Sequence, residues 1–513
     1  MAELGIVLAC LAAGALAALR WLRIVQRDQY YPAAVRFARR WWLGMPVNLV
    51  LLGVAVVGAL LAPVTPWAAL LTAAAAAVGP LGLSVRGRTA PLAWSRRLVR
   101  LAIVLLLVNT VLLAVVTLVA VVLELAPLHA LVVGGAQLAL LQPVIVDLAG
   151  AISRPIEARL MRVFVGRATR RLRQVGPTVV AITGSYGKTT TKGYVRQLVA
   201  PVRTVVASPA SYNNTGGLAR AINEQLLPGT DVFVAEMGTY GAGEIAQLCR
   251  WIPPDVAVIT AIGPVHLERM GSLDAIVRAK SEILERARVC VLNVDGHGLA
   301  AVADALGPEK VVWRCSERDP TADVHASLDE GGTLHLSVRG RELAALPGAT
   351  AQPINVACAV AVAIALDVPE ATIADALPGL TSAEHRLQVA SAANGATVID
   401  DTYNSNPAGS RAALAALQRV DARRRAVVTP GMIELGSVQA TENEAFARAA
   451  AEVADDLLLV NRTNRPALLR GARGGRAQVH VFDRREQAVA WVRANLGPAD
   501  AVLYENDLPD TYP

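Results

Sequence analysis

The stretch V-V-A-I-T-G-S-Y-G-K-T-T-T, residues 179–191, predicts a strand, a tight turn and a helix at the centre of this chain. Its β-branched run enters a glycine turn, and Lys188 and Thr189 open the expected helix. Such turns cradle phosphate, because glycines let backbone N–H groups close around an anion at a helix N-terminus. Lys188 would then reach the β- and γ-phosphates, and the Thr189 hydroxyl would bind Mg²⁺. Ile182 stands where the longer form of the motif has glycine, so this is the shorter T-G-x-x-G-K-T variant.

The first 150 residues are apolar enough to predict membrane-spanning helices. Mean hydropathy is +0.41 and 54% of the residues are hydrophobic, although only 4% are aromatic. Five stretches are each about 17–23 residues long, enough to cross a hydrocarbon core of about 30 Å. They are residues 3–19, 45–63, 66–84, 101–123 and 128–150. The alternatives are a cleaved signal peptide, which would explain the first stretch alone, and buried helices of a soluble domain.

Arginine placement predicts the orientation of these stretches. Arginines cluster at 20–40, 86–100 and 154–173, and the two other connections have none. The positive-inside rule assigns the clusters to the cytoplasm. We therefore predict a multi-pass protein of the cell membrane, with its N-terminus outside and everything after residue 150 cytoplasmic. The net charge of +7 predicts contact with membrane lipid and no nucleic-acid partner, because basic and aromatic residues do not interleave.

Cysteine and lysine usage narrows the chemistry. The five cysteines are scattered and have no C-x-x-C spacing, so neither a disulfide framework nor a zinc site is expected. The chain has four lysines against forty-five arginines. Three of the lysines, Lys188, Lys192 and Lys280, follow the phosphate loop. A lysine kept against this background indicates a point charge or a nucleophilic amine, which a guanidinium cannot supply.

From residue 175 to about 380, apolar strands alternate with amphipathic helices, as is typical of a mostly parallel sheet. Polar residues stand at or just after the ends of three predicted strands, 232–238, 256–263 and 289–295. They are Glu236, His266, Asn293 and Asp295. Ligands of open α/β sheets gather at the carboxyl ends of strands. We therefore expect these side chains to converge on the phosphate loop.

The predicted fold is an N-terminal α-helical membrane domain followed by two α/β domains. Residues 1–150 form the membrane domain and residues 151–174 an arginine-rich amphipathic connector. Residues 175–382 form a P-loop ATP-binding domain with a mostly parallel sheet. Residues 383–513 form a smaller Rossmann-like α/β domain, with strands expected at 425–431, 456–461 and 501–506.

Eight motifs in series resemble the Mur ligase family, the ATP-dependent amide ligases of cell-wall peptide assembly. They are T-G-S-Y-G-K-T-T (183–190), S-Y-N-N-T-G-G (211–217), A-E-M-G (235–238), I-G-P-V-H-L-E (262–268), A-K-S-E-I-L (279–284), N-V-D (293–295), H-R-L (385–387) and D-D-T-Y-N-S-N-P (400–407). The last motif and M-I-E-L-G (432–436) make the chain most similar to the D-alanyl-D-alanine-adding type, MurF.

The resemblance implies a role for each matching residue. ATP binding is implied for Thr183, Gly184, Ser185, Gly187, Lys188, Thr189, Thr190, Asn293, Arg386 and Asp401. Two Mg²⁺ ions are implied at Thr189, Glu236, His266 and Lys280, the last as a carbamylated lysine. Catalysis is implied for Lys188, His266, Lys280 and Arg386, and substrate contact for Asn213, Asn214, Tyr403 and Asn404. The plainer alternatives are a helix-surface lysine at Lys280, a surface arginine at Arg386 and turn residues at Asp401, Asn213 and Asn214.

The mechanism implied by the resemblance is acyl-phosphate chemistry. A substrate carboxylate attacks the γ-phosphate of ATP, and an amine then displaces phosphate to form an amide. The substrate would be a small-molecule or lipid-linked cell-wall precursor, to which D-Ala-D-Ala or a related amine is added. A membrane paralogue that makes a poly-γ-glutamate-type amide is one alternative, and an ATP-driven transporter is another. The identity of both substrates and the oligomeric state stay open.

The chain departs from the family pattern in three places. The five apolar stretches stand where the family has a soluble domain that binds UDP. Ala351 and Gln352 stand where His and Asn are expected, although Asn355 is kept. The chain also reads Y-E-N-D-L-P-D-T-Y-P at 504–513, where a K-G-S-type loop is usual. We therefore expect the ATP chemistry to be retained and the recognition of substrates to differ.

Overall fold

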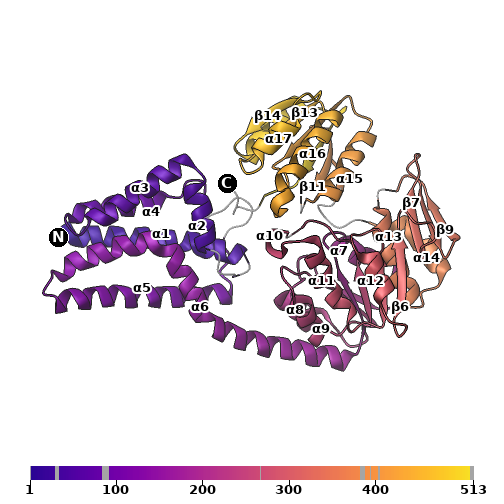
Figure 1. The fold of residues 1–513 in the computed structure, drawn as a ribbon, viewed down its shortest axis with the longest axis horizontal. Helices are drawn as coiled ribbons and strands as arrows, with labels where there is room; N and C mark the ends of the chain where they lie inside the picture. The colour runs from indigo at the N-terminus through magenta and orange to yellow at the C-terminus, as the bar shows by residue number, and fades with distance from the viewer. Residues whose placement is uncertain are drawn as a thin grey trace. The chain divides into compact units, whose positions relative to one another are not determined.

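The computed structural model describes residues 2–28, 30, 34–83, 92–265, 267–349, 351–381, 388–392, 394–402 and 405–508. These residues divide into two compact units, one up to Leu160 and the other from Met161 to Asp507. The first unit is helical, and the second contains two β-sheets with helices packed against them (Figure 1).

The first unit is built from α-helices and one 3₁₀ turn. They are α1 (Ala2–Arg27), α2 (Ala34–Leu43), α3 (Pro46–Leu61), η1 (Pro66–Ala68), α4 (Ala69–Val78), α5 (Arg96–Val122) and α6 (Pro127–Val175). Small residues let α1 and α6 approach closely, since a Cβ added to Gly135 would lie 3.1 Å from the Cys10 Cβ. Arg20 belongs to α1 and donates to carbonyls at the end of α4, including Ala77 O at 2.8 Å.

The described residues supply fewer candidate membrane spans than the five predicted. Among the described residues, α1, α5 and α6 are long and apolar enough to cross a membrane, and a fourth span results if α2 and α3, bent by 110°, count as one. The stretch 66–84 yields only a short apolar helix, Pro66–Val78. Pro63 lies before this helix, Pro66 is its first residue, and Pro80 follows it. A proline inside a helix removes a backbone hydrogen bond, so these residues keep the apolar run from becoming one long helix.

The predicted connector, residues 151–174, is not a separate element, because α6 runs through it and through Pro155. Its last turns belong to the core of the second unit. Ala168 and Leu172 are buried there, and Arg171 Nε donates to the Leu226 carbonyl at 2.5 Å. Arginine is a good helix former, so the basic composition extends the helix instead of interrupting it.

The first sheet of the second unit has nine strands in the order β2-β3-β1-β4-β5-β6-β7-β8-β9. The strands are β1 (Thr178–Thr183), β2 (Val205–Ala207), β3 (Val232–Glu236), β4 (Val256–Ile259), β5 (Val289–Asn293), β6 (Val311–Ser316), β7 (Val324–Leu328), β8 (Leu334–Val338) and β9 (Arg341–Leu346). Pairing is parallel from β2 to β7 and antiparallel for β8 and β9. The sheet is thus mixed and mostly parallel, as the sequence predicted.

Helices cover both faces of this sheet. They are α7 (Lys188–Val199), α8 (Thr215–Gln225), α9 (Glu244–Trp251), α10 (Leu267–Met270), α11 (Leu273–Ser281), η2 (Glu282–Leu284), α12 (Leu299–Ala305), α13 (Pro353–Ala365), α14 (Glu370–Ala376) and η3 (Leu377–Gly379). Val180 and Ile182 of β1 join the core with α7 and α13, whereas Val179 and Ala181 join the core with α8 and α9. Successive side chains of a strand point to opposite faces, so a strand covered on both sides is apolar throughout.

The second sheet has six strands in the order β10-β11-β15-β12-β13-β14, and β10 is antiparallel to β11. The strands are β10 (Gln388–Ser391), β11 (Thr397–Asp401), β12 (Arg424–Thr429), β13 (Asp456–Val460), β14 (Gln478–Phe482) and β15 (Asp500–Glu505). The helices are α15 (Pro407–Arg419), η4 (Gly436–Val438), α16 (Gln439–Val453), α17 (Arg465–Gly471) and α18 (Arg485–Asn495). The strands expected near 425, 456 and 501 are β12, β13 and β15.

Candidate active site

The phosphate loop lies between β1 and α7, and two of its positions accept glycine alone. Gly184 and Gly187 have φ values of +157° and +82°. A Cβ at Gly184 would lie 2.0 Å from Thr260 Oγ1, and a Cβ at Gly187 would lie 2.4 Å from Asn355 Oδ1. Left-handed backbone and close neighbours both exclude a side chain. The loop therefore brings bare backbone to the N-terminus of α7, where an anion is stabilised.

Two lysines converge on this loop. Lys188 Nζ donates to Gly184 O at 2.8 Å, and Lys280 Nζ donates to the same oxygen at 3.0 Å. Lys280 is buried near the end of α11. Burial, together with the neighbouring Lys188 ammonium, holds the pKa of the Lys280 amine well below its ordinary value. The alternative of an ordinary helix-surface lysine is excluded, because Lys280 is 3% exposed.

Glu236 forms a second charged group at the carboxyl end of β3. Its Oε2 accepts from Thr189 Oγ1 at 3.0 Å and from Lys192 Nζ at 2.9 Å. Burial alone would raise the pKa of this carboxyl, but the Lys192 and Lys188 ammonium groups and two hydrogen bonds outweigh burial and lower it. The side chain is therefore an anion held beside the first turn of α7.

Other predicted nucleotide-binding residues support the loop from inside. Thr183 Oγ1 donates to Met237 O at 2.8 Å, and Ser185 Oγ donates to Gly263 O at 3.1 Å. Asn293 Nδ2 donates to Thr260 O at 2.8 Å. These three side chains are buried, so they fix the strand ends beneath the loop. Thr190 is half-buried in the first turn of α7.

The two predicted substrate asparagines differ in their surroundings. Asn213 Nδ2 donates to Glu236 Oε1 at 3.4 Å. Asn214 is the N-cap of α8, where its side chain accepts from Gly217 N at 2.9 Å. Asparagine is among the best N-cap residues, so Asn214 has a structural task regardless of any substrate.

Asp401 belongs to the second sheet, at the end of β11. In the register of that sheet it lies opposite Glu505, the last residue of β15. Both side chains are buried, and Ser405 Oγ donates to Glu505 Oε1. Burial, with the Asp401 charge, raises the pKa of Glu505 well above its ordinary value. The acid pair is a feature of the second sheet that the sequence did not predict.

Four predicted site residues, His266, Arg386, Tyr403 and Asn404, lie outside the described residues. The described part of the chain contains no group of three His, Cys, Asp or Glu side chains that could hold a metal ion. Of the predicted metal ligands, Thr189 and Glu236 are in contact, and Lys280 donates to Gly184 O of the phosphate loop.

Three residues that support this site were given no role in it by the sequence. Lys192 forms the buried ion pair with Glu236, Thr260 Oγ1 donates to Tyr186 O at 2.5 Å, and Asn355 accepts from Thr191 Oγ1 at 3.3 Å. The scarcity of lysine pointed to Lys192. The family pattern pointed to Asn355 without giving it a role, and Thr260 gave no signal, because its partner Tyr186 is distant in sequence.

Comparisons with known proteins agree with this geometry. The family model described as "Mur ligase middle domain" matches residues 182–363, and "Mur ligase, glutamate ligase domain" matches residues 385–504. The UDP-N-acetylmuramoyl-tripeptide--D-alanyl-D-alanine ligase of Mycobacterium tuberculosis is 36% identical over 365 residues, or 64% of this chain and 70% of that protein. The Bacillus subtilis enzyme of the same name is 29% identical over 53% of this chain and 59% of its own length. The crystal structure of MurF from Acinetobacter baumannii has a TM-score of 0.58 and 26% identity, covering 67% of this chain and 77% of that one.

These relatives correct one prediction. A multi-pass location in the cell membrane, with the N-terminus outside and the α/β domains cytoplasmic, is contradicted, because the relatives are MurF enzymes, which are soluble cytoplasmic ligases. The orientation was also derived from five apolar stretches taken as spans, and the described residues supply three or four candidate spans.

The phosphate loop and the buried lysines are therefore those of an established enzyme class. A relative at 36% identity is covered over 70% of its length, and both α/β domains match the family's models. The chain belongs to the Mur ligase family and is an ATP-dependent ligase of the MurF type, which forms carbon–nitrogen bonds.

Proposed function

We propose that this chain joins D-alanyl-D-alanine to the tripeptide of a UDP-N-acetylmuramoyl precursor in peptidoglycan synthesis. The printed names of its relatives supply both substrates. The observation that carries the proposal is the pair of lysines at the phosphate loop, Lys188 and Lys280, on one carbonyl oxygen. Two lysine side chains that donate hydrogen bonds at this position suit the transfer of a phosphoryl group to a carboxylate.

The reaction balances in two steps. The tripeptide carboxylate attacks the γ-phosphorus, the bond to the β-phosphate oxygen breaks, and ADP leaves. The amine of D-alanyl-D-alanine then attacks the acyl phosphate, and inorganic phosphate leaves with the formation of the amide. The backbone of the loop and Lys188 would stabilise the negative charge on the transferring group, and Asn213 lies beside Glu236 where a substrate would be positioned.

Magnesium fits the side chains around Glu236. The Thr189 hydroxyl and the Glu236 carboxylate are the oxygen donors that Mg²⁺ prefers, and Glu236 Oε1 holds only a long 3.4 Å contact to Asn213 among the described residues. When bound, the ion would neutralise phosphate charge. His266 is proposed as a ligand of a second ion, and Arg386 and Asp401 as contacts to the nucleotide.

Lys280 is proposed to be carbamylated, which is an uncommon modification of a lysine. The reaction needs a neutral amine, because the nitrogen lone pair attacks carbon dioxide and a proton is released. The lowered pKa of Lys280 supports a neutral amine, and its burial would protect the carbamate. The modified side chain would be an anionic oxygen ligand.

The decisive experiment combines the purified chain with ATP, Mg²⁺, D-alanyl-D-alanine and UDP-N-acetylmuramoyl-tripeptide. A parallel reaction uses a lipid-linked muramyl tripeptide. Mass spectrometry should detect the pentapeptide product, with one phosphate released per amide formed. Absence of an amide product in both reactions would contradict the proposal, and product from the lipid-linked substrate alone would reassign the precursor.

Two glutamate variants make this test specific to the site. Glu236→Gln should lower turnover at least about a hundredfold, because it removes the anion between Thr189 and Lys192. Glu224→Gln is the matched control, since Glu224 is exposed and pairs with Arg220 on the surface of α8. Equal activity of both variants would show that Glu236 is not part of the reaction.

A further inference from the structure

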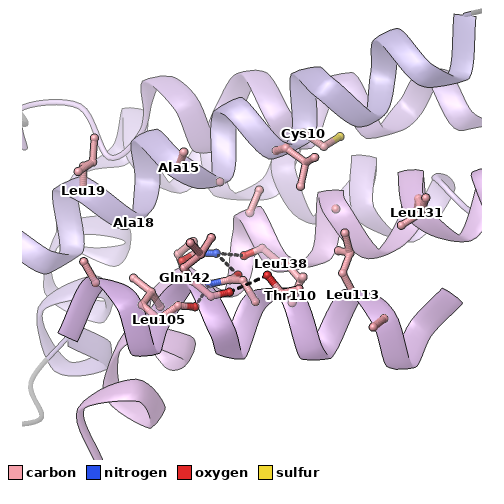
Figure 2. A pocket seen from close by; sticks show the side chains of 18 of the residues that line it. Cys10, Ala15, Ala18, Leu19, Leu105, Thr110, Leu113, Leu131, Leu138 and Gln142 are labelled. Carbon is pink, nitrogen blue, oxygen red and sulfur yellow. Dashed lines mark hydrogen bonds between the residues drawn. The ribbon is translucent and has the colours of Figure 1, made fainter. Parts of the chain in front are cut away.

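An elongated apolar pocket lies between α1, α5 and α6 of the helical unit (Figure 2). Its volume is about 1060 Å³, at the upper end of what small-molecule sites offer. Its lining follows α5 from Ala102 to Val121, a distance of about 28 Å at the rise of an α-helix. The pocket therefore has the dimensions of a long, slender molecule.

The walls are mainly hydrophobic, and several lining leucines are exposed. Leu106 and Leu118 of α5 are 67% and 63% exposed, and Leu11 of α1 is 45% exposed. Small residues form the wall between α1 and α6, where a Cβ added to Gly14 would lie 3.8 Å from the Cα of Ala139. Covering these leucines with an apolar ligand is favourable because it removes apolar area from water.

Polar side chains of α5 also line the pocket, and each donates a hydrogen bond within its own helix. Each donates to a carbonyl of its own helix one turn earlier: Asn109 to Leu105 at 2.8 Å, Thr110 to Leu106 at 2.9 Å and Thr117 to Leu113 at 2.8 Å. These groups therefore need no ligand to satisfy them.

Gln142 of α6 differs from these α5 side chains, because one of its polar atoms lacks a hydrogen-bond partner among the described residues. Its Nε2 donates to Asn109 Oδ1 at 2.8 Å and to Leu138 O at 3.1 Å. These two oxygens fix the orientation of the amide, because a flipped amide would set its oxygen against both of them. Gln142 is 3% exposed, and its Oε1 has no hydrogen-bond partner among the described residues. A buried acceptor without a donor is costly, and a ligand in the pocket that Gln142 lines would supply one.

The position of this acceptor limits the ligand further. Asn109, to which Gln142 is bonded, lies about 10 Å along α5 from Ala102 and about 18 Å from Val121. A donor that reaches Gln142 Oε1 therefore lies within the length of the ligand and not at its end. Figure 2 shows Gln142 between Leu19 on one side and Leu131 on the other.

We infer that this pocket binds an elongated apolar molecule with a single hydrogen-bond donor within its length, as in a secondary amide that carries an apolar chain on each side. The donor meets Gln142 Oε1, and the chains cover the leucines of α1 and α5. This binding does not depend on the ligase reaction, because every lining residue belongs to the helical unit.

The test compares two probes of the same shape, N-octyl decanamide and octyl decanoate. The amide carries the N–H donor, and the ester has an oxygen in its place. Each is titrated against Nile red bound to the full chain, with the same detergent in every sample. The amide should displace the dye at a concentration roughly five- to tenfold lower than the ester does. Equal displacement by both probes, or by neither, would overturn the inference.

Two glutamine variants of α6 locate the effect. Gln142→Met keeps the length of the side chain and removes the acceptor, so the preference for the amide should vanish while the ester binds as before. Gln137→Met is the matched control, because Gln137 lies on the exposed side of the same helix, outside the pocket, and should keep the preference. A preference that survives Gln142→Met would contradict the assignment. If that variant does not fold, the comparison of probes on the unmodified chain still decides the question.

Discussion

At the scale of single residues, the site depends on charged groups that are buried at a cost. Burial and the Lys188 ammonium lower the pKa of the Lys280 amine, and Glu236 is held as an anion by Lys192 and Thr189. A buried ionisable group weakens the fold unless a partner compensates it, so its retention indicates a function. Residue type and motif predicted Lys188, Lys280 and Glu236, but not the pairing of Glu236 with Lys192.

Lys280→Met tests this trade of stability for activity. The pKa of Lys280 is lowered in the folded chain and is about 10.4 in the unfolded chain. At pH values between these two, the unfolded chain binds more protons at Lys280, so the free energy of unfolding rises with pH. Methionine does not titrate, so the substitution removes this pH-dependent contribution to the free energy of unfolding. The variant should therefore unfold at higher temperature than the wild type near neutral pH, in buffer free of carbon dioxide, and its stability should change less as the pH is raised.

The same variant should lose turnover by at least about a hundredfold, because the group beside the transferring phosphate is gone. Lys310→Met is the control, since Lys310 donates to the Leu284 and Ala287 carbonyls and lies outside the phosphate loop. A Lys280→Met enzyme that is both fully active and no more stable would contradict the role assigned to this amine.

At the scale of elements, hydrophobic periodicity predicted the buried strands and missed the exposed ones. β1, β3 and β4 are almost wholly buried and read as continuous apolar runs. The edge strands β9 and β14 have mostly exposed or half-buried side chains, so they lack the pattern that identifies a strand. In the helical unit, apolar runs predicted helices correctly but not where prolines would break them.

Two glycines of the same loop–helix element test the backbone argument. Gly187→Ala should lower the free energy of unfolding by about 1–2 kcal/mol or more, because φ is +82° and the new Cβ would lie 2.4 Å from Asn355 Oδ1. Gly193→Ala should raise it by about 0.5–1 kcal/mol, since this position is inside α7 and its nearest neighbour, Gln197 Nε2, is 4.0 Å away.

Urea unfolding of both glycine variants measures the difference, and nucleotide binding should be lost in Gly187→Ala alone. Equal stability of the two variants would mean that the loop backbone is not constrained as described.

At the scale of the whole molecule, the end of α6 belongs to the second unit although the helix begins in the first. Phe164 O accepts from Asn223 at 3.2 Å, Arg171 donates to Leu226 O at 2.5 Å, and Ala168 and Leu172 are buried against the helices of the first sheet. The helix therefore completes the core of the α/β unit, a task that a flexible linker could not perform.

Two truncations test this role. A chain that begins at Met161 should unfold cooperatively, because it keeps every core cluster of the second unit. A chain that begins at Pro177 should unfold at a clearly lower temperature, since loss of the buried Ala168 and Leu172 costs on the order of a few kcal/mol. Calorimetry compares the two, and identical unfolding temperatures would show that the end of α6 contributes nothing.

The sequence by itself determined the phosphate loop, the family and the alternation of strands and helices after the loop, and it predicted the residues of the site. These depend on local backbone geometry and on residue type, which a short motif records. Tertiary structure alone decided that Lys192 pairs with Glu236, that Asn355 packs on Gly187 and that Asp401 lies opposite Glu505. Burial and charge pairing between distant segments depend on how the chain packs, and no local pattern records that packing.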